Sequence, residues 1–290
     1  MSLTRWTGIA RKFPSPIYKF VAQNYIDYKF PRHIFIETTA NCNLSCAYCP
    51  REKRQDNMDF NLFKEIINEC RNYGSRSFSL HLFGEPLMYP KILEAIRYIK
   101  KQNRRNTILL TTNGTFLNKF IDNLVELRVD RIIWSWRRNN FTDETIRKLR
   151  KHGGFVRILL EETPKEEIEK WKNFPRLEVK HLHNYGGNIN TSKWHDNKLP
   201  DRYPCYHLWL APAIRWNGEI IECCNIPKLG SEVFGIYGKN SIHEIWNGDR
   251  IKTLRESHLR NLYPGVCKNC DSWQAYPDIF FNFQKKKDHL

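Results

Sequence analysis

From residue 33 onward, short apolar runs alternate with amphipathic stretches, and this alternation limits the possible folds of the chain more than any other feature. The predicted strands span residues 34–38, 78–82, 107–112, 131–135, 155–161 and 177–183, with predicted helices between them. Such alternation is typical of a mostly parallel α/β sheet. Six βα units are fewer than the eight of a closed barrel. We therefore expect a partial (β/α)6 TIM-type barrel whose open side can admit a large substrate.

The alternation stops after residue 184, where a polar connector begins. Beyond it, Asn217-Gly218 joins two strand-like runs and predicts a β-hairpin. A helix from about 242 to 258 is expected to follow. We divide the chain into an N-terminal extension (1–32), the barrel (33–184), the connector (185–204), a small α+β domain (205–275) and a C-terminal tail (276–290).

The chain carries nine cysteines and a net charge of +16 in 290 residues. It shows no secretory apolar region and no apolar stretch of transmembrane length, so we expect a cytoplasmic protein without a membrane span. Thiols stay reduced in the cytosol, so the cysteines are predicted to be metal ligands rather than disulfides. Lys and Arg are dispersed along the chain, which favours a solvated basic surface over a dedicated nucleic-acid site.

Three of the cysteines, Cys42, Cys46 and Cys49, are spaced C-x3-C-x2-C directly after the first predicted strand. Active sites of barrels gather at the carboxyl ends of the strands, which is where this loop falls. Three thiolates can hold three irons of a cubane cluster and leave the fourth iron open. A zinc knuckle would need a fourth ligand, and none lies nearby in the sequence. The triplet therefore predicts a catalytic metal centre.

A second group of cysteines lies in the C-terminal third, and Cys70 stands apart from both groups. Cys223 follows Gly218 as G-x4-C, and a distant C-x2-C comes later. The available thiols are Cys205, Cys223, Cys224, Cys267 and Cys270. Four of them can close one site, holding either an iron-sulfur cluster or zinc. Cys70 falls on the apolar face of a predicted helix and is expected to be a buried core residue.

The first triplet resembles the radical S-adenosylmethionine (SAM) superfamily. This resemblance implies a 4Fe-4S cluster whose open iron is chelated by SAM, and cleavage of SAM to a 5′-deoxyadenosyl radical that abstracts a substrate hydrogen. It places Tyr48 near the adenine. Phe83-Gly84-Glu85-Pro86 matches the family's Gly-Gly-Glu-Pro motif with phenylalanine at the first position, which implies that Gly84, Glu85 and Pro86 bind SAM at its amine.

Asn113 and Ser135, at the ends of the third and fourth predicted strands, match further family positions that face the ribose and carboxylate of SAM. The plain alternatives are a turn signal at Asn113-Gly114 and a helix cap at Ser135. The family often has an acidic residue two positions after this serine, whereas this chain has Arg137.

The second cysteine group resembles the auxiliary-cluster domains called SPASM, in the reduced form called twitch. The resemblance implies one auxiliary 4Fe-4S cluster held by Cys205, Cys223, Cys267 and Cys270, with Cys224 as the spare thiol. Trp246 matches a recurrent helix of these domains. A four-cysteine zinc site is the alternative. A cluster closed by four thiolates is expected to transfer electrons.

Together the two resemblances imply a radical SAM oxidoreductase that acts on a small molecule or a peptide, with a flavodoxin- or ferredoxin-type protein as electron donor. An RNA-modifying or RNA-binding enzyme is the second hypothesis, and a zinc-binding interaction module is the third. Catalytic residues are not assigned. Substrate-facing candidates at the barrel mouth are Trp136, Arg137, Glu161, Glu162, His183 and His207.

Overall fold

A computed structural model describes residues 29–136, 142–160, 163–191, 204–205, 207–228 and 230–271. Within these residues, one nine-stranded sheet has the order β6-β5-β4-β3-β2-β1-β7-β8-β9. The first six strands are β1 (His33–Ile36), β2 (Ser77–Ser79), β3 (Thr107–Thr112), β4 (Arg131–Ser135), β5 (Phe155–Leu159) and β6 (Leu177–Lys180). All pairs among these six are parallel. The expected α/β fold with a partial barrel is confirmed.

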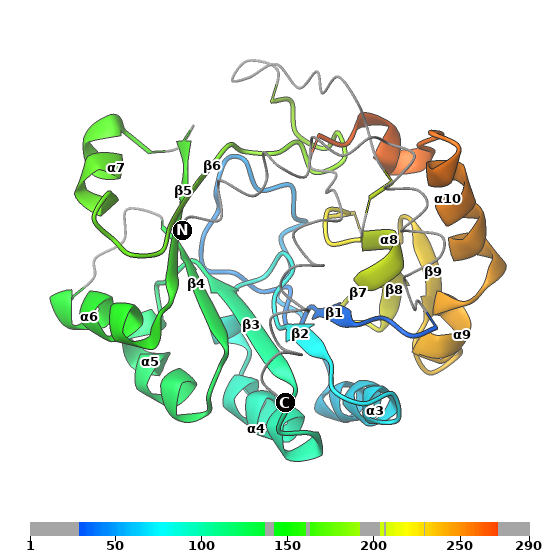
Figure 1. Ribbon diagram of the computed structural model, residues 1–290, viewed down its shortest axis with the longest axis horizontal. Coiled ribbons are helices and arrows are strands. Elements are labelled where there is room, and N and C mark those ends of the chain that lie inside the picture. Colours follow the sequence, from blue (N-terminus) through cyan, green and yellow to red (C-terminus); the bar gives the residue numbers. More distant parts are fainter. Residues whose placement is uncertain are drawn as a thin grey trace, which may run out of the picture.

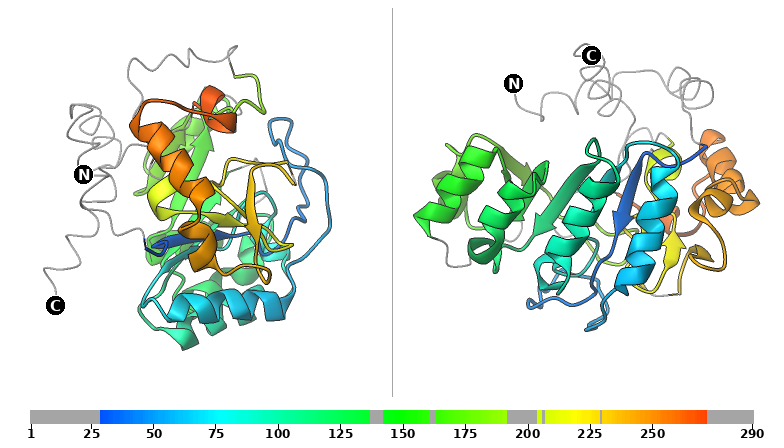
Figure 2. Two further views of the ribbon diagram at one scale, coloured as in Figure 1. Left: turned by 90° about the vertical axis from the view of Figure 1, so that its right-hand side faces the viewer. Right: turned by 90° about the horizontal axis from the view of Figure 1, so that it is seen from below.

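Helices cover the outer side of the curved sheet (Figure 1; Figure 2, right). They are α3 (Phe60–Arg71), α4 (Ile92–Gln102), α5 (Leu117–Glu126), α6 (Asp143–His152) and α7 (Lys165–Trp171). Alternate strand residues such as Ile34, Ile108 and Ile132 are fully buried against this layer. Cys70 of α3 belongs to the same core and is 1 % exposed, as predicted. This packing leaves the intervening strand residues on the concave face of the barrel.

The C-terminal part extends the barrel sheet. It contains α8 (His207–Leu210), β7 (Ala213–Ile214), β8 (Glu219–Ile221), β9 (Val233–Ile236), α9 (Ile242–Trp246), α10 (Asp249–Leu259) and the 3-10 turn η3 (Gly265–Asn269). β7 pairs in parallel with β1, with Phe35 opposite Ala213 and Ile36 opposite Ile214. The small domain therefore shares its sheet with the barrel.

The hairpin predicted at Asn217-Gly218 is confirmed, because β7 and β8 pair antiparallel and Gly218 has a φ of +87°. The single helix expected from 242 to 258 was wrong. A capping box at Ser241 and Glu244 starts α9. Gly248 then takes an extended conformation as the N-cap of α10 and divides the segment into two helices.

Within the described residues, no helix is long and apolar enough to cross a membrane. Most of the predicted N-terminal extension, the larger part of the connector and the whole tail lie outside those residues.

Candidate metal centres

The first cysteine triplet lies on a loop that leaves β1 and returns to α3. The two ends of the loop meet, since Thr39 and Asn57 form an isolated antiparallel bridge. The backbone N–H of Cys49 donates to the carbonyl of Cys46 at 3.0 Å. All three cysteines are partly exposed. The loop thus presents its thiols at the carboxyl end of β1, as the barrel rule predicts.

Arg51 holds the shape of this loop from within. Its Nη2 donates to the carbonyl oxygens of Cys42 at 3.3 Å and Leu44 at 3.0 Å. Sequence reasoning missed this residue, because a single arginine after a cysteine carries no pattern of its own. The guanidinium satisfies carbonyls that would otherwise need water, and so it stabilises the turn that brings the cysteines together.

The three thiols fit the open cubane that the resemblance implies. Burial raises the pKa of the Cys49 thiol, Arg51 opposes this shift, and Cys46 and Cys42 add to it. The last two effects show that the three thiols are electrostatically coupled. Because metal ligands must be thiolates, binding of a cluster would release their protons. A set of three thiols leaves one iron of a cubane without a protein ligand.

Gly84 lets the segment after β2 pack directly on the cysteine loop. A Cβ at this position would lie 1.9 Å from the carbonyl oxygen of Thr39. The next residue, Glu85, donates its N–H to the carbonyl of Asn41 at 2.8 Å. Any side chain at position 84 would therefore displace the backbone that leads to Cys42.

The Glu85 side chain is 2 % exposed and joins the ends of two strands. Its carboxylate accepts hydrogen bonds from Thr112 Oγ1 at 2.6 Å, the Asn113 N–H at 2.7 Å and the Leu87 N–H at 3.2 Å. Burial raises its pKa and these donors oppose the rise. The carboxylate thus accepts hydrogen bonds from the end of β3 and from η1 (Pro86–Met88). Its contact with SAM stays a prediction.

The structure brings part of the predicted SAM set to the triplet. Asn113 Nδ2 lies 3.0 Å from Asn43 Oδ1 and 3.8 Å from Cys42 Sγ. Tyr48 is buried in a cluster with Leu159 and Leu182. Pro86 is buried in η1, and Ser135 is 9 % exposed at the end of β4. Their roles toward SAM stay predictions.

The second group of thiols gathers from three separate segments. Cys205 precedes α8, Cys223 and Cys224 follow β8, and Cys267 and Cys270 lie in and after η3. Burial raises the pKa of Cys224 to about 12, and Cys205 and Cys270 add to this shift. Burial likewise raises the pKa of Cys223, with Cys224 and Cys267 among the neighbours that add to it. All five predicted thiols are therefore linked as neighbours.

This arrangement fits a four-thiolate cluster, but it does not single out Cys223 over Cys224. The pKa of Cys224 is raised by two of the other predicted ligands, Cys205 and Cys270, whereas that of Cys223 is raised by Cys267. The Asn225 N–H also donates to Cys223 Sγ at 3.4 Å. The assignment of Cys223 as ligand and Cys224 as spare stays a prediction.

Asn184 and Asp271 connect the barrel to the last cysteines. The Asn184 N–H donates to both carboxylate oxygens of Asp271, at 2.8 and 2.9 Å, and Asn184 Nδ2 donates to the carbonyl of Asn269 at 2.6 Å. These bonds hold the residues on both sides of Cys270. Sequence reasoning missed the pair, because 87 positions separate the two residues.

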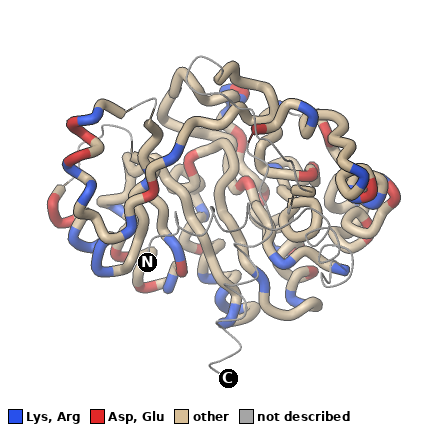
Figure 3. Tube along the Cα trace, turned by 45° about the horizontal axis from the view of Figure 1, so that its top comes forward, with Lys and Arg blue, Asp and Glu red and all other residues tan. Residues whose placement is uncertain are grey.

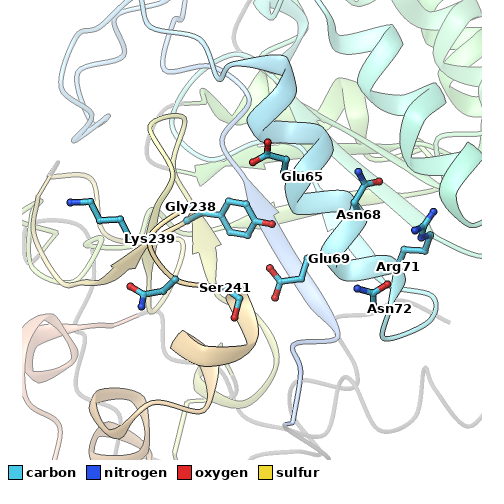
Figure 4. Close-up of a pocket in the computed structure, with 10 residues that line it drawn as sticks. Glu65, Asn68, Glu69, Arg71, Asn72, Gly238, Lys239 and Ser241 are labelled. Atoms are coloured by element: carbon cyan, nitrogen blue, oxygen red, sulfur yellow. The ribbon is translucent and has the colours of Figure 1, made fainter.

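A pocket between α3 and the segment joining β9 to α9 lies away from both cysteine groups, and no predicted ligand lines it (Figure 4). Glu69 of α3 accepts hydrogen bonds there from the N–H groups of Ile242 and His243, at 3.1 and 3.0 Å. The pocket thus lies where a side chain of α3 accepts hydrogen bonds from the first residues of α9.

Among the described residues, no group of three His, Cys, Asp or Glu side chains is arranged around a single metal ion.

Of the predicted mouth residues, Trp136 and His207 are buried and His183 is partly exposed. Arg137, Glu161 and Glu162 lie outside the described residues.

Comparisons with known proteins match both cysteine-bearing regions. Residues 36–170 match the model of the radical SAM superfamily, and residues 205–271 match SPASM, an iron-sulfur cluster-binding domain. The second match favours an iron-sulfur cluster over zinc at the C-terminal thiols.

Two curated relatives align along most of the chain. The tungsten-containing aldehyde ferredoxin oxidoreductase cofactor-modifying protein of Pyrococcus furiosus is 24% identical, over 82% of this chain and 87% of the relative. The S-adenosyl-L-methionine-dependent 2-deoxy-scyllo-inosamine dehydrogenase of Niallia circulans is 24% identical, over 82% of this chain and 92% of the relative.

Among solved structures, BtrN in complex with AdoMet and 2-DOIA has a TM-score of 0.64 at 20% identity, covering 85% of this chain and 97% of BtrN. This likeness shows the shared fold. The family matches account for both thiol groups and name their cofactors, a 4Fe-4S cluster with SAM and auxiliary iron-sulfur. Residues 36–170 are a radical SAM domain, and residues 205–271 are a C-terminal SPASM domain.

Proposed function

We propose that this enzyme oxidises a carbinol of its substrate to a carbonyl by removing two electrons. The observation that carries the proposal is the pairing of an incomplete thiol set, Cys42, Cys46 and Cys49, with a second set that holds enough thiols to close a cluster. When bound, the first cluster with SAM supplies a 5′-deoxyadenosyl radical and the closed cluster supplies an electron acceptor.

The atoms and electrons of this oxidation balance when SAM and both clusters are bound. Hydrogen-atom abstraction from the carbinol carbon removes one proton and one electron, leaving a carbon radical. Loss of the hydroxyl proton and the second electron then yields the carbonyl. The chain's own residues keep the first site in shape, through Arg51 within the loop and the close approach of Gly84. Reduction of the first cluster needs an external donor, and we propose a flavodoxin- or ferredoxin-type protein.

A small polar molecule is the favoured substrate class. The relative from Niallia circulans is a dehydrogenase, and its likeness extends along 82% of this chain. A peptide side chain that carries a hydroxyl group would undergo the same step, so the test below includes one. Recognition of RNA would need a contiguous basic face. Figure 3 instead shows Lys and Arg interspersed with Asp and Glu along the described trace, which counts against an RNA substrate.

The test begins with anaerobic reconstitution and an iron count. Two cubanes predict about eight irons per chain and formation of 5′-deoxyadenosine from SAM and a reductant. Cys70→Ala is the matched control, because Cys70 is a core residue of α3 and should leave the iron content unchanged. About four irons in the wild-type protein would remove the auxiliary cluster from the proposal.

The oxidation itself is tested with alcohols deuterated at the carbinol carbon. The panel contains cyclitols, aminocyclitols and a serine-containing peptide. Transfer of deuterium to 5′-deoxyadenosine, with one carbonyl product per SAM consumed, is the expected result. A product that keeps its oxidation state while SAM is regenerated would contradict a two-electron oxidation.

A further inference from the structure

Arg51 carries a positive charge into the loop of the first triplet. Its Nη2 donates to the carbonyl oxygens of Cys42 at 3.3 Å and Leu44 at 3.0 Å, and its Nη1 lies 3.5 Å from the carbonyl oxygen of Glu52. All of these acceptors are uncharged backbone groups. They satisfy donors of the guanidinium but leave its charge in place, because arginine stays protonated in proteins.

The neighbouring Arg54 shows the opposite arrangement. It is exposed, and it pairs with Glu52 at 3.0 Å and Asp56 at 3.8 Å. These two carboxylates are the nearest to Arg51 in sequence, and Arg54 binds both of them. Within the ranges that the structure describes, no ion pair joins a carboxylate to Arg51, whose guanidinium contacts carbonyl groups. The charge of Arg51 is therefore not cancelled by a bonded partner.

Burial shields this charge from water on one side. Arg51 is partly buried and, together with Glu37 and Arg215, borders a cavity of about 20 Å³, which has room for about one water molecule. Glu219 pairs with Arg215 at 2.6 Å. Burial raises the pKa of Glu37 to about 7, so this carboxyl group carries only a partial charge near neutral pH. The charge of Arg51 is thus screened less than that of an exposed arginine.

The charge of Arg51 lies close to the thiols. Covalent geometry keeps the carbonyl oxygen of a cysteine within about 5 Å of its own sulfur, so Arg51 Nη2 lies within about 8 Å of Cys42 Sγ. A nearby positive charge stabilises the more negative state of a metal centre. Reduction adds an electron to the cluster that these thiols would hold, and the charge around a cluster helps to set its reduction potential. The charge of Arg51 therefore favours the reduced state.

We propose that Arg51 raises the reduction potential of the iron-sulfur cluster held by Cys42, Cys46 and Cys49, and so helps an external donor to reduce it. This role is distinct from holding the loop in shape. A neutral donor can bond to a carbonyl oxygen, whereas an effect on the potential requires the charge. The inference goes beyond the proposed oxidation and does not depend on it, because the potential is measured without substrate.

The test is a redox titration of the reconstituted holoenzyme, followed by electron paramagnetic resonance. The signal that changes when SAM is added identifies the cluster of the first triplet. At the potential that half-reduces this cluster in the wild type, Arg51→Gln should lower its ratio of reduced to oxidised form by about threefold to tenfold. Arg51→Lys keeps the charge and should stay within about twofold of the wild type. Arg54→Gln makes the same change of net charge at an exposed position, so it is the matched control and should leave the ratio unchanged.

Two results would overturn the inference. Arg51→Gln would match the wild type, or Arg51→Gln and Arg51→Lys would lower the ratio equally, which is the result expected if Arg51 only holds the loop. If Arg51→Gln assembles too little cluster to titrate, the wild type itself decides, because salt screens a charge. Raising NaCl from about 50 to about 500 mM should then lower the ratio by about twofold, and an unchanged ratio would show that the inference is wrong.

Discussion

The two thiol groups are built in opposite ways. Cys42, Cys46 and Cys49 share one short loop, and local bonds such as those of Arg51 shape it. The C-terminal thiols, called the rear site below to distinguish them from the front site formed by the first triplet, come from three segments. Long-range contacts such as Asn184 with Asp271 bring them together. A local ligand set can form as soon as its loop folds, whereas a distributed set depends on completion of the whole domain. The two sites should therefore respond differently to the same kind of damage.

The largest expected effect comes from removing one ligand at each site. Cys46→Ala should abolish 5′-deoxyadenosine formation and lower the iron content from about eight to about four. Cys267→Ala should lose a similar amount of iron but keep SAM cleavage, while product formation stops. Iron assay, electron paramagnetic resonance and product analysis together check both variants. Retention of SAM cleavage by Cys46→Ala would contradict the assignment of the front site.

A second pair of variants sharpens the rear ligand set. If Cys223 is the ligand, Cys223→Ser should lose the auxiliary cluster, about four irons, and Cys224→Ser should keep it. If Cys224 is the ligand, as its electrostatic coupling to Cys205 and Cys270 allows, the results of the two variants should be reversed. Spectra of the reduced cluster in each variant identify the coordinating thiol. Equal iron content in the two variants would contradict the prediction that only one of the two cysteines is a ligand.

Gly84→Ala should damage the front site selectively. The new Cβ would meet the Thr39 carbonyl at 1.9 Å, so the backbone leading to Cys42 must move. We expect a loss of about 2 kcal/mol or more in unfolding free energy and weaker SAM binding. Gly74→Ala is the control, since its Cβ would meet nothing within 4 Å, and only the positive φ would cost stability. Loss of rear iron in Gly84→Ala would show that the two sites are not independent.

Glu37 provides a pH test at the junction of the two regions. Burial raises the pKa of its carboxyl group to about 7, against hydrogen bonds from the backbone of Phe83 and Trp216. The folded state holds the proton more tightly than the unfolded chain does. Protonation of Glu37 therefore adds about 3 kcal/mol to the unfolding free energy below about pH 4.5. This stabilisation is lost as pH rises to about 7.

Glu37→Gln should remove this pH dependence. The unfolding free energy of the variant relative to wild type should rise by about 3 kcal/mol between pH 4.5 and 7.5, measured anaerobically in urea. Glu126→Gln, at an exposed helical position, is the control. A constant difference between variant and wild type over this range would contradict the raised pKa.

The smallest expected effect concerns Asp271. Asp271→Asn weakens the charge-assisted bonds from the Asn184 N–H and should cost about 1 kcal/mol. Iron loss from the rear site to a chelator should accelerate, while loss from the front site stays unchanged. Asp249→Asn, on the exposed first turn of α10, is the comparison variant. Equal acceleration at both sites would show that Asp271 stabilises the fold in general.

Features that depend on neighbouring residues were predictable from the sequence. Strands carry Ile34 and Ile108 at alternating core positions, and Asn217-Gly218 marks its own turn. The triplet was recognisable for the same reason, because its thiols are adjacent in sequence.

Features that depend on distant residues were not predictable. Asn247 is the C-cap of α9 and Gly248 is the N-cap of α10, but Gly is tolerated within helices, so its presence alone does not decide the break. The pairing of Asn184 with Asp271 and the closeness of Cys224 to Cys205 arise only when separate segments pack together. No local pattern encodes such contacts.

The parallel pairing of β7 with β1 has a consequence for any attempt to divide the protein. The Phe35 N–H donates to the Pro212 carbonyl at 3.0 Å and the Glu37 N–H to the Ile214 carbonyl at 2.8 Å. Truncation before β7 would leave this side of β1 as a naked sheet edge, which recruits strands from other molecules. The barrel should thus aggregate when it is produced alone, and the SPASM domain acts as a covalent cover for the strand that leads into the cysteine loop.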